Sequence, residues 1–259
     1  MNSVKLFLFD MDGTLYLGNR LFDFTLPLLK KIKAEGKRYI FITNNSSKSV
    51  ETYVDKFAHM GIYAEKSDFL TSSQATAIYL KQNHPNRTLY VCGTESLKKE
   101  LKKSGFEITD DTEKSECIVM GFDTELTFKK LDDVSRMLST RDIPYIATNP
   151  DYVCPTEYGF VPDCGSVCDM IFNATKKRPI VIGKPSPLMI RLAMEKEGAK
   201  PDETAVIGDR IYTDIKSGIN AGTKTVLVLS GETTLEEAEK SPDKPDYIFK
   251  DAGEIIKYI

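Results

Sequence analysis

The architecture of this chain follows from Lys5-Leu6-Phe7-Leu8-Phe9-Asp10-Met11-Asp12-Gly13-Thr14-Leu15. Its apolar run predicts a short buried strand, and Gly13 predicts a turn directly after it. Asp10 and Asp12 stand one residue apart at the end of that strand, where two carboxylates repel each other. A divalent cation would remove the repulsion, and one carboxylate would then act as a nucleophile while the other transfers protons. The alternative is a strand-end turn with two solvated aspartates.

The composition fits a globular protein with one large domain or two smaller ones. The chain has 259 residues, 41% of them hydrophobic, and its net charge of −3 comes from interleaved acids and bases. No basic stripe points to nucleic acid, and no apolar run approaches the roughly 20 residues that span a bilayer. The apolar residues 6–9 are too few for a signal peptide. We therefore expect a cytoplasmic enzyme or binding protein whose partners include neither nucleic acid nor a membrane.

Five cysteines at irregular spacings predict neither a disulfide scaffold nor a zinc site. They are Cys92, Cys117, Cys154, Cys164 and Cys168. A core of this size needs no covalent cross-link, and the chain contains no CxxC pair of the kind that structural zinc sites use. His59 and His84 also lie far from these cysteines in sequence. We expect ordinary reduced thiols.

Short apolar runs alternate with amphipathic stretches, which predicts βα units around a mainly parallel sheet. Strands are expected at residues 5–10, 38–43, 88–92, 117–120, 144–148, 180–182, 204–207, 224–229 and 246–249. Helices are expected at residues 24–35, 49–60, 73–82, 95–104, 127–140, 165–175, 187–197, 212–221 and 252–258. The expected fold class is α/β.

Two polar segments, residues 84–87 and 176–179, look like linkers that bracket the middle of the chain. The block between them, of about a hundred residues, is large enough to be a domain of its own. We therefore expect a core formed by residues 1–80 and 180–259, and an inserted domain formed by residues 81–179.

In parallel α/β sheets, ligands bind beyond the carboxyl ends of the strands. Polar residues follow four of the predicted strands: Asp10 and Asp12, then Thr43-Asn44-Asn45-Ser46, then Gly183-Lys184, then Gly208-Asp209-Arg210 with Asp214. Each segment alone is also typical of a turn, a helix N-terminus or a solvated lysine. Together they supply carboxylates for a hard cation such as Mg²⁺, and ammonium, amide and hydroxyl donors for an anion. A phosphoryl group is the anion that suits these donors.

These segments resemble, in order, the four motifs of the haloacid dehalogenase (HAD) superfamily. The forms Ile42-Thr-Asn-Asn-Ser46, Gly183-Lys-Pro-Ser-Pro187 and Gly208-Asp-Arg-Ile-Tyr-Thr-Asp214 are similar to those of subfamily IIA, which includes p-nitrophenyl and sugar phosphatases. The long insert after Thr43 is similar to the type-2 cap of that subfamily. The resemblance covers nearly the whole chain, and it implies a Rossmann-like parallel-sheet core with an inserted α/β cap domain.

The resemblance also implies a mechanism. Asp10 would be the nucleophile that forms an aspartyl-phosphate, and Asp12 would protonate the leaving alkoxide and then deprotonate water. The Asp10 carboxylate, the Asp12 backbone carbonyl and Asp209 would bind Mg²⁺. Thr43, Asn44 and Asn45 would bind phosphoryl oxygens. Lys184 would neutralise charge on Asp10 and the phosphate, and Asp214 would orient Lys184 or a metal-bound water.

The implied function is a Mg²⁺-dependent phosphatase that hydrolyses small phosphomonoesters, such as sugar phosphates, nucleotides or related metabolites, and p-nitrophenyl phosphate in vitro. Two alternatives are a HAD-type phosphotransferase and a sensor that binds a phospho-ligand without turnover. A small phosphorylated metabolite is the expected partner, and a homodimer formed through the cap would fit the family.

The insert would determine which leaving group is accepted, because every substrate shares the phosphate. Two interpretations of its segment 151–166 stay open. Asp151, Tyr158 and Ser166 would contact the substrate in one of them. In the other, this irregular segment is a βα connection rich in turn residues.

Overall fold

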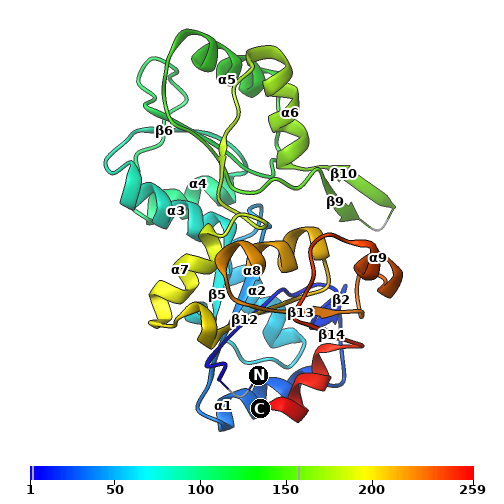
Figure 1. Ribbon diagram of the computed structural model, residues 1–259. Helices are drawn as coiled ribbons and strands as arrows, with labels where there is room; N and C mark the ends of the chain where they lie inside the picture. Colours follow the sequence, from blue (N-terminus) through cyan, green and yellow to red (C-terminus); the bar gives the residue numbers. More distant parts are fainter. Residues whose placement is uncertain (2, 157) are drawn as a thin grey trace. The chain divides into compact units, whose positions relative to one another are not determined.

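The computed structural model describes residues 1, 3–156 and 158–259, and the chain forms two compact units. We name them the core unit (Met1–Thr43, Val50–Leu70 and Lys184–Ile259) and the insert unit (Asn44–Ser49 and Thr71–Gly183). Each unit has its own sheet with helices against it (Figure 1). The insert is longer than the expected residues 81–179, because α3 (Ser72–Asn83) packs on another insert helix and β11 (Ile180–Val181) pairs with an insert strand.

The core unit is built on a six-stranded sheet with the strand order β14-β13-β12-β1-β4-β5. Its strands are β1 (Leu6–Phe9), β4 (Arg38–Thr43), β5 (Phe69–Thr71), β12 (Thr204–Gly208), β13 (Lys224–Val228) and β14 (Tyr247–Phe249). The pairings from β14 to β4 are all parallel. From β1 the chain adds strands toward one edge, and from β12 it adds them toward the other. The strand order therefore reverses between β1 and β12, which is where α/β sheets of this kind bind ligands.

Helices and short turns complete the core unit. They are α1 (Thr25–Ala34), α2 (Val50–His59), α7 (Leu188–Glu197), α8 (Lys216–Ala221), α9 (Leu235–Lys240), the 3₁₀ segments η1 (Lys66–Asp68), η2 (Pro201–Glu203) and η4 (Ala252–Tyr258), and the π-helical turn η3 (Ile211–Ile215). A small ribbon joins β2 (Tyr16–Leu17) to β3 (Arg20–Leu21). The expected helices are present within a few residues of their predicted bounds, and the expected helix at 212–221 divides into η3 and α8. The ribbon, β5 and α9 were not expected.

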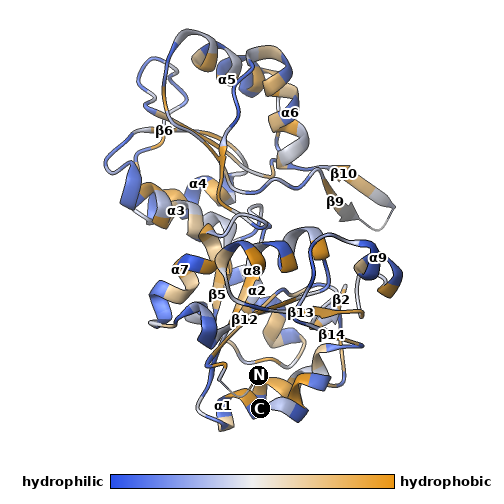
Figure 2. Cartoon of the chain, in the orientation of Figure 1, coloured by the Kyte–Doolittle hydropathy of each residue, from blue (hydrophilic) through white to orange (hydrophobic). Residues whose placement is uncertain are grey.

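Aromatic packing closes one face of the core sheet. The ring centroids of Phe41 on β4, Phe57 on α2 and Phe69 on β5 lie 4.8 to 5.2 Å from one another. All three side chains are buried, and each is worth about 1.5–3 kcal/mol in transfer from water. On α2 the buried positions Val50, Tyr53 and Phe57 follow the helical period. Figure 2 shows the resulting pattern, with hydrophobic strands inside and helices that are hydrophobic on one side.

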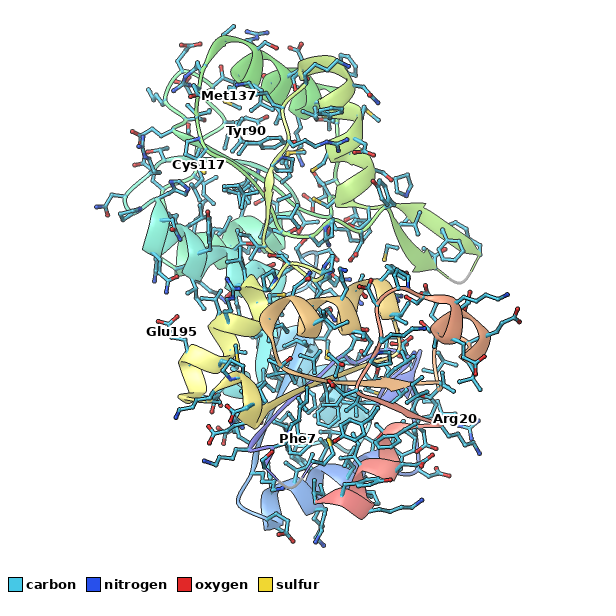
Figure 3. All side chains as sticks on the ribbon, in the orientation of Figure 1. Phe7, Arg20, Tyr90, Cys117, Met137 and Glu195 are labelled. Atoms are coloured by element: carbon cyan, nitrogen blue, oxygen red, sulfur yellow. The ribbon has the colours of Figure 1, made fainter. Side chains whose placement is uncertain are left out.

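The insert unit has a four-stranded parallel sheet in the order β11-β8-β7-β6. Its other strands are β6 (Leu89–Cys92), β7 (Cys117–Met120) and β8 (Tyr145–Ala147), and its other helices are α4 (Glu95–Lys103), α5 (Phe128–Thr140) and α6 (Cys164–Thr175). Tyr90 and Met137, both labelled in Figure 3, belong to the hydrophobic cluster between this sheet and the helices α5 and α6. All five cysteines are free thiols.

One segment of the insert differs from its prediction. The stretch expected to be irregular contains an antiparallel hairpin of β9 (Val153–Thr156) and β10 (Gly159–Pro162). The sequence pattern did not predict this hairpin because both strands contain proline, which is normally excluded from strands unless they lie at an edge.

Every helix in the described ranges is too short or too polar to cross a bilayer.

Candidate active site

The register of three neighbouring strands brings the predicted motifs to one edge of the core sheet. Phe9 of β1 pairs with Phe41 of β4 on one side and with Ile207 of β12 on the other. Asp10 is therefore level with the residues that directly precede Thr43 and Asp209. Parallel strands hold their carboxyl ends at a common edge, so three motifs that are far apart in sequence end side by side.

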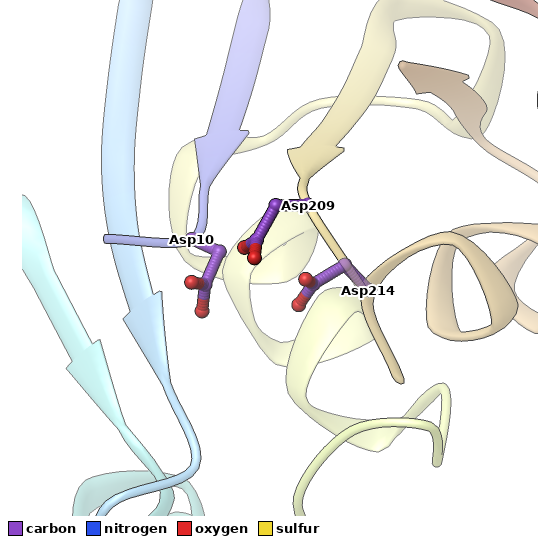
Figure 4. A group of neighbouring side chains, drawn as sticks. All are labelled: Asp10, Asp209 and Asp214. Carbon is purple, nitrogen blue, oxygen red and sulfur yellow. The ribbon is translucent and has the colours of Figure 1, made fainter. Parts of the chain in front are cut away.

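Three carboxylates gather at this edge. One oxygen from each of Asp10, Asp209 and Asp214 lies within 4.8 Å of the others. Figure 4 shows the three side chains together. Asp10 and Asp209 directly follow β1 and β12, whereas Asp214 lies in the π-helical turn η3. Asp209 and Asp214 are buried and Asp10 is partly buried.

Lys184 is the cation of this group. Its Nζ donates to Oδ1 of Asp10 and to Oδ1 of Asp214, both at 2.5 Å. Burial lowers the pKa of Lys184, but the two carboxylates outweigh burial and raise it above its ordinary value. The lysine therefore stays charged. Lys184 follows β11, which we expected in the core sheet. Because β11 belongs to the insert sheet, Lys184 is instead the first residue after the chain returns from the insert unit.

The carboxylates carry more negative charge than the lysine balances. Burial raises the pKa of Asp209 to about 6, and the charge of Asp10 adds to the effect. Burial also raises the pKa of Asp214 to about 7, although Lys184 opposes the shift. The nearby Arg210 guanidinium pairs with Glu232 at 2.9 Å. The charge excess and the hard oxygen donors fit a divalent cation such as Mg²⁺.

Asp209 is held in place from several sides. Thr14 Oγ1 donates to its Oδ1 at 3.2 Å, and the Glu232 backbone N–H donates to its Oδ2 at 2.8 Å. A Cβ built on Gly13 would lie 2.5 Å from Asp209 Oδ2, and one built on Gly231 would lie 2.0 Å from the same atom. Gly13 also has a φ of +82°, which favours glycine. Both positions need glycine so that the backbone can approach the carboxylate.

The segment Ser230–Thr233, which follows β13, was not among the predicted site residues. Besides the contacts of Gly231 and Glu232, the Thr233 N–H donates to the Asp209 carbonyl at 3.1 Å, and Ser230 Oγ donates to the Gly13 carbonyl at 2.7 Å. The signal was present, because Ser230-Gly-Glu-Thr233 is another polar stretch directly after a strand of the same sheet.

Asp214 has both carboxylate oxygens engaged. Oδ1 accepts from Lys184, and Oδ2 accepts from the backbone N–H of Arg210 at 3.1 Å. A Cβ on Gly208 would lie 2.3 Å from the Asp214 side chain, so this close approach also depends on glycine. The geometry suits a residue that orients Lys184, which is one of the two roles expected for Asp214.

The other predicted site residues have contacts of their own. The Asp12 side chain is exposed, and its Oδ1 accepts from the Gly18 N–H at 3.3 Å. Thr43 is the last residue of β4. Asn44 and Asn45 belong to the insert unit. Asn45 Oδ1 accepts from the N–H and the hydroxyl of Ser47, at 2.9 and 2.8 Å.

The three insert residues considered as substrate contacts differ in their exposure and in their hydrogen bonds. Ser166 Oγ donates to the Tyr152 carbonyl at 2.5 Å, which is a structural contact at the start of α6. Tyr158 is 82% exposed in the β9–β10 hairpin region. Asp151 contacts Asn44.

Comparison with known proteins adds to this geometry. A family model described as haloacid dehalogenase-like hydrolase matches residues 7–107, and a HAD-hydrolase-like model matches residues 181–255. The chain is 35% identical to an acid sugar phosphatase of Staphylococcus saprophyticus over 99% of this chain and 98% of that protein.

Solved structures are also similar along nearly the whole of this chain. The 4-nitrophenylphosphatase of Thermotoga maritima has a TM-score of 0.94 and 39% identity, covering 99% of this chain and 97% of its own. A glycerol phosphate phosphatase of Mycobacterium tuberculosis, solved in complex with calcium, has a TM-score of 0.89 and 28% identity, covering 96% of this chain and 74% of its own.

Proposed function

The chain belongs to subfamily IIA of the haloacid dehalogenase (HAD) superfamily of hydrolases, and from this premise we propose that it hydrolyses small phosphomonoesters through an aspartyl-phosphate on Asp10, with Mg²⁺ as cofactor. That it is a phosphatase follows from its relatives. The contact of Lys184 with both Asp10 and Asp214, beside Asp209, is the observation that carries the mechanism. Gathering acids in this way costs stability, so folding alone does not account for it.

Asp10 is the proposed nucleophile. One of its oxygens attacks the phosphorus, a P–O bond to the carboxylate forms, and the P–O bond to the leaving alkoxide breaks. Water then attacks the same phosphorus, which releases inorganic phosphate and restores the carboxylate. Because Lys184 Nζ already lies 2.5 Å from Asp10, its charge offsets the repulsion between the carboxylate and the incoming phosphoryl group.

Asp12 is the proposed general acid and base. Its exposed position, two residues beyond Asp10, supports this role. In the first step the protonated carboxyl group donates its proton to the leaving oxygen, and in the second step the carboxylate accepts a proton from the attacking water. The proton count is then the same as at the start of the cycle.

The acidic group fits Mg²⁺, which prefers oxygen ligands and needs few carboxylates because it keeps several waters. Asp10, Asp209 and the Asp12 backbone carbonyl would hold the ion, while Asp214 orients Lys184. When bound, Mg²⁺ would neutralise charge on the transferring phosphoryl oxygens. The charge excess of the three carboxylates supports this assignment.

Thr43, Asn44 and Asn45 are the proposed donors to the phosphoryl oxygens. Sugar phosphates are the first substrate class to test, since an acid sugar phosphatase is similar along nearly the whole chain, and p-nitrophenyl phosphate is a suitable test substrate. We assign the choice among leaving groups to the insert unit, because the phosphate is common to all of them.

Phosphate release from p-nitrophenyl phosphate and from a panel of sugar phosphates and nucleoside monophosphates, with Mg²⁺ or with a chelator, tests the proposal. Asp10→Asn should lower kcat by at least about three orders of magnitude. Asp202→Asn, which alters an exposed carboxylate of the core unit, should leave kcat unchanged. Near-normal turnover by a folded Asp10→Asn variant would rule out the proposed nucleophile. Adding acceptor alcohols reveals any phosphotransferase activity as a phosphorylated alcohol.

A further inference from the structure

The loop of residues 44–49, which directly follows Thr43, is held by the insert unit. Its first residue is fixed through the backbone. The Asn44 carbonyl accepts from Ser72 Oγ at 2.6 Å and from Asn149 Nδ2 at 2.8 Å. All these groups are buried, so each hydrogen bond would be costly to lose.

The same loop is fixed a second time at Ser46. Ser46 Oγ accepts from the Phe122 N–H at 2.9 Å and from Thr148 Oγ1 at 3.0 Å. Ser73 Oγ donates to the Ser46 carbonyl at 3.3 Å. Because residues from α3 and from the segments after β7 and β8 converge on this loop, it is structurally a part of the insert.

One contact of the loop is made by a charged side chain. Asn44 Nδ2 lies 3.2 and 3.1 Å from the two carboxylate oxygens of Asp151. Hydrogen bonds to an ionised acceptor are stronger than neutral ones. The Asp151 contact therefore fixes the side chain of Asn44 as well as its backbone.

Asp151 itself has a rigid support. The Gly165 N–H, in the first turn of α6, donates to the Asp151 carbonyl at 2.8 Å. A Cβ on Gly165 would lie only 2.1 Å from the Pro150 carbonyl oxygen. The close approach of α6 to residues 150–151 therefore depends on glycine, and it fixes the backbone that carries the Asp151 carboxylate.

Two of the points where the chain passes between the units lie beside proposed site residues: Thr43 precedes Asn44, and Lys184 follows Gly183. The Gly183 N–H donates to the Thr148 carbonyl at 2.9 Å. Consecutive Cα atoms are about 3.8 Å apart. Asn44, an insert residue, is therefore bonded directly to Thr43, a proposed donor to the phosphoryl group. Gly183, also an insert residue, is bonded directly to Lys184.

We propose that Asp151 is a positioning residue: through its carboxylate contacts to the Asn44 amide it sets the loop 44–49 and hence the phosphoryl donors that the loop presents. The inference rests on the proposed function. Asp151 acts on the phosphoryl group that all substrates share, and it does not touch the leaving group. Under this proposal Asp151 is not a contact to the leaving group, and the test below distinguishes the two roles.

The test uses the full chain with p-nitrophenyl phosphate, two sugar phosphates, and inorganic phosphate as a competitive inhibitor. Asp151→Ala should raise the KM of every substrate and the Ki of phosphate by about tenfold, as expected for losing a hydrogen bond to a charged group, while kcat changes less. Asp151→Asn retains one acceptor oxygen and should recover part of the loss. Because it is isosteric, it also keeps the test valid if the alanine variant fails to fold.

A double-mutant cycle separates positioning from a merely structural effect. Asn44→Ala with Asp151→Ala should be no worse than Asn44→Ala alone, because the second change removes a group whose partner is already absent. Asp142→Ala is the matched control, since that carboxylate is fully exposed in the same unit, and it should leave KM and Ki unchanged.

Two results would overturn the inference. One is a rise in KM that differs strongly among substrates with different leaving groups while the Ki of phosphate stays constant. That result would make Asp151 a substrate contact. The other is a double variant in which the effects of the two single changes on KM and Ki add. Failure of the proposed function is distinguishable, because the wild-type protein would then release no phosphate from any substrate.

Discussion

The Lys184 ammonium lies 2.5 Å from Oδ1 of Asp214, and the two side chains are only 3% and 1% exposed. A buried ion pair offsets its desolvation only when its charges balance and its geometry is good. Here the same ammonium also serves Asp10 at 2.5 Å. One buried cation is therefore the shared partner of two carboxylates.

Lys184→Met should lower the free energy of unfolding by about 3–5 kcal/mol, because it leaves buried carboxylates without their partner. It should also lower kcat by at least about 100-fold, because charge on Asp10 and the phosphoryl group is no longer offset. Denaturant unfolding and phosphate release measure the two effects.

The double variant Lys184→Met/Asp214→Asn is the control for this prediction. It removes one of the charges that the first change leaves unbalanced, so it should recover much of the stability without recovering turnover. If Lys184→Met alone were as stable as the wild type, the Lys184–Asp214 pair would contribute nothing to folding.

Gly13→Ala should lower both stability and activity. The backbone there has a φ of +82°, and the new Cβ would lie 2.5 Å from Asp209 Oδ2. A left-handed conformation costs a non-glycine residue about 1–2 kcal/mol, and the contact adds to that cost. Gly18→Ala is matched in conformation, with a φ of +61°, but its Cβ would meet nothing within 4 Å. The free energy of unfolding of Gly18→Ala should fall by about 1 kcal/mol, and its turnover should stay normal. An equal loss of turnover in both variants would contradict the role given to the Gly13–Asp209 contact.

Mg²⁺ should stabilise the wild-type protein against heat. A ligand present at 100 times its Kd adds about 2.7 kcal/mol, or roughly 5–10 °C in Tm for a chain of this size. Asp209→Asn should lose this response. Without Mg²⁺ the variant should be more stable than the wild type at pH 7.5, because burial raises the pKa of the Asp209 carboxyl to about 6 and its ionised form is costly. An unchanged Mg²⁺ response in Asp209→Asn would remove Asp209 from the metal site.

Asp163→Asn should change how stability depends on pH. Asp163 begins α6 with its Oδ1 accepting from the Cys164 N–H at 2.5 Å. Burial, with the charge of Asp151 adding to it, raises the pKa of Asp163 to about 6 from an ordinary 3.8. The folded state therefore binds the proton more tightly than the unfolded state. The contribution of this group is most favourable below about pH 4, and it falls by about 3 kcal/mol as the pH rises through 6.

Asparagine at this position keeps the helix cap but does not ionise. The variant should gain stability over the wild type near pH 7 and show no gain near pH 4, as measured by denaturant unfolding followed by circular dichroism. The same difference between the two proteins at both pH values would show that Asp163 does not titrate in this range.

Several strands of both sheets were predictable because the local sequence is enough to define a strand. β4 and β7 have their expected bounds, and β1 is within one residue at each end, since a run of buried apolar residues followed by polar ones marks a strand and its end. Asp10, Lys184, Asp209 and Asp214 were named from that rule together with the family resemblance, and the structure brings their side chains together.

Contacts between distant parts of the chain were not predictable in this way. Asn44 meets Asp151 across 107 residues, β11 pairs in the insert sheet and not in the core sheet, and the segment after β13 closes around Asp209. Local patterns of polarity specify which residues form a strand or a turn. They do not specify which strand becomes its neighbour or which side chain meets a carboxylate, because those outcomes depend on how whole elements pack to bury their apolar faces and satisfy their buried polar groups.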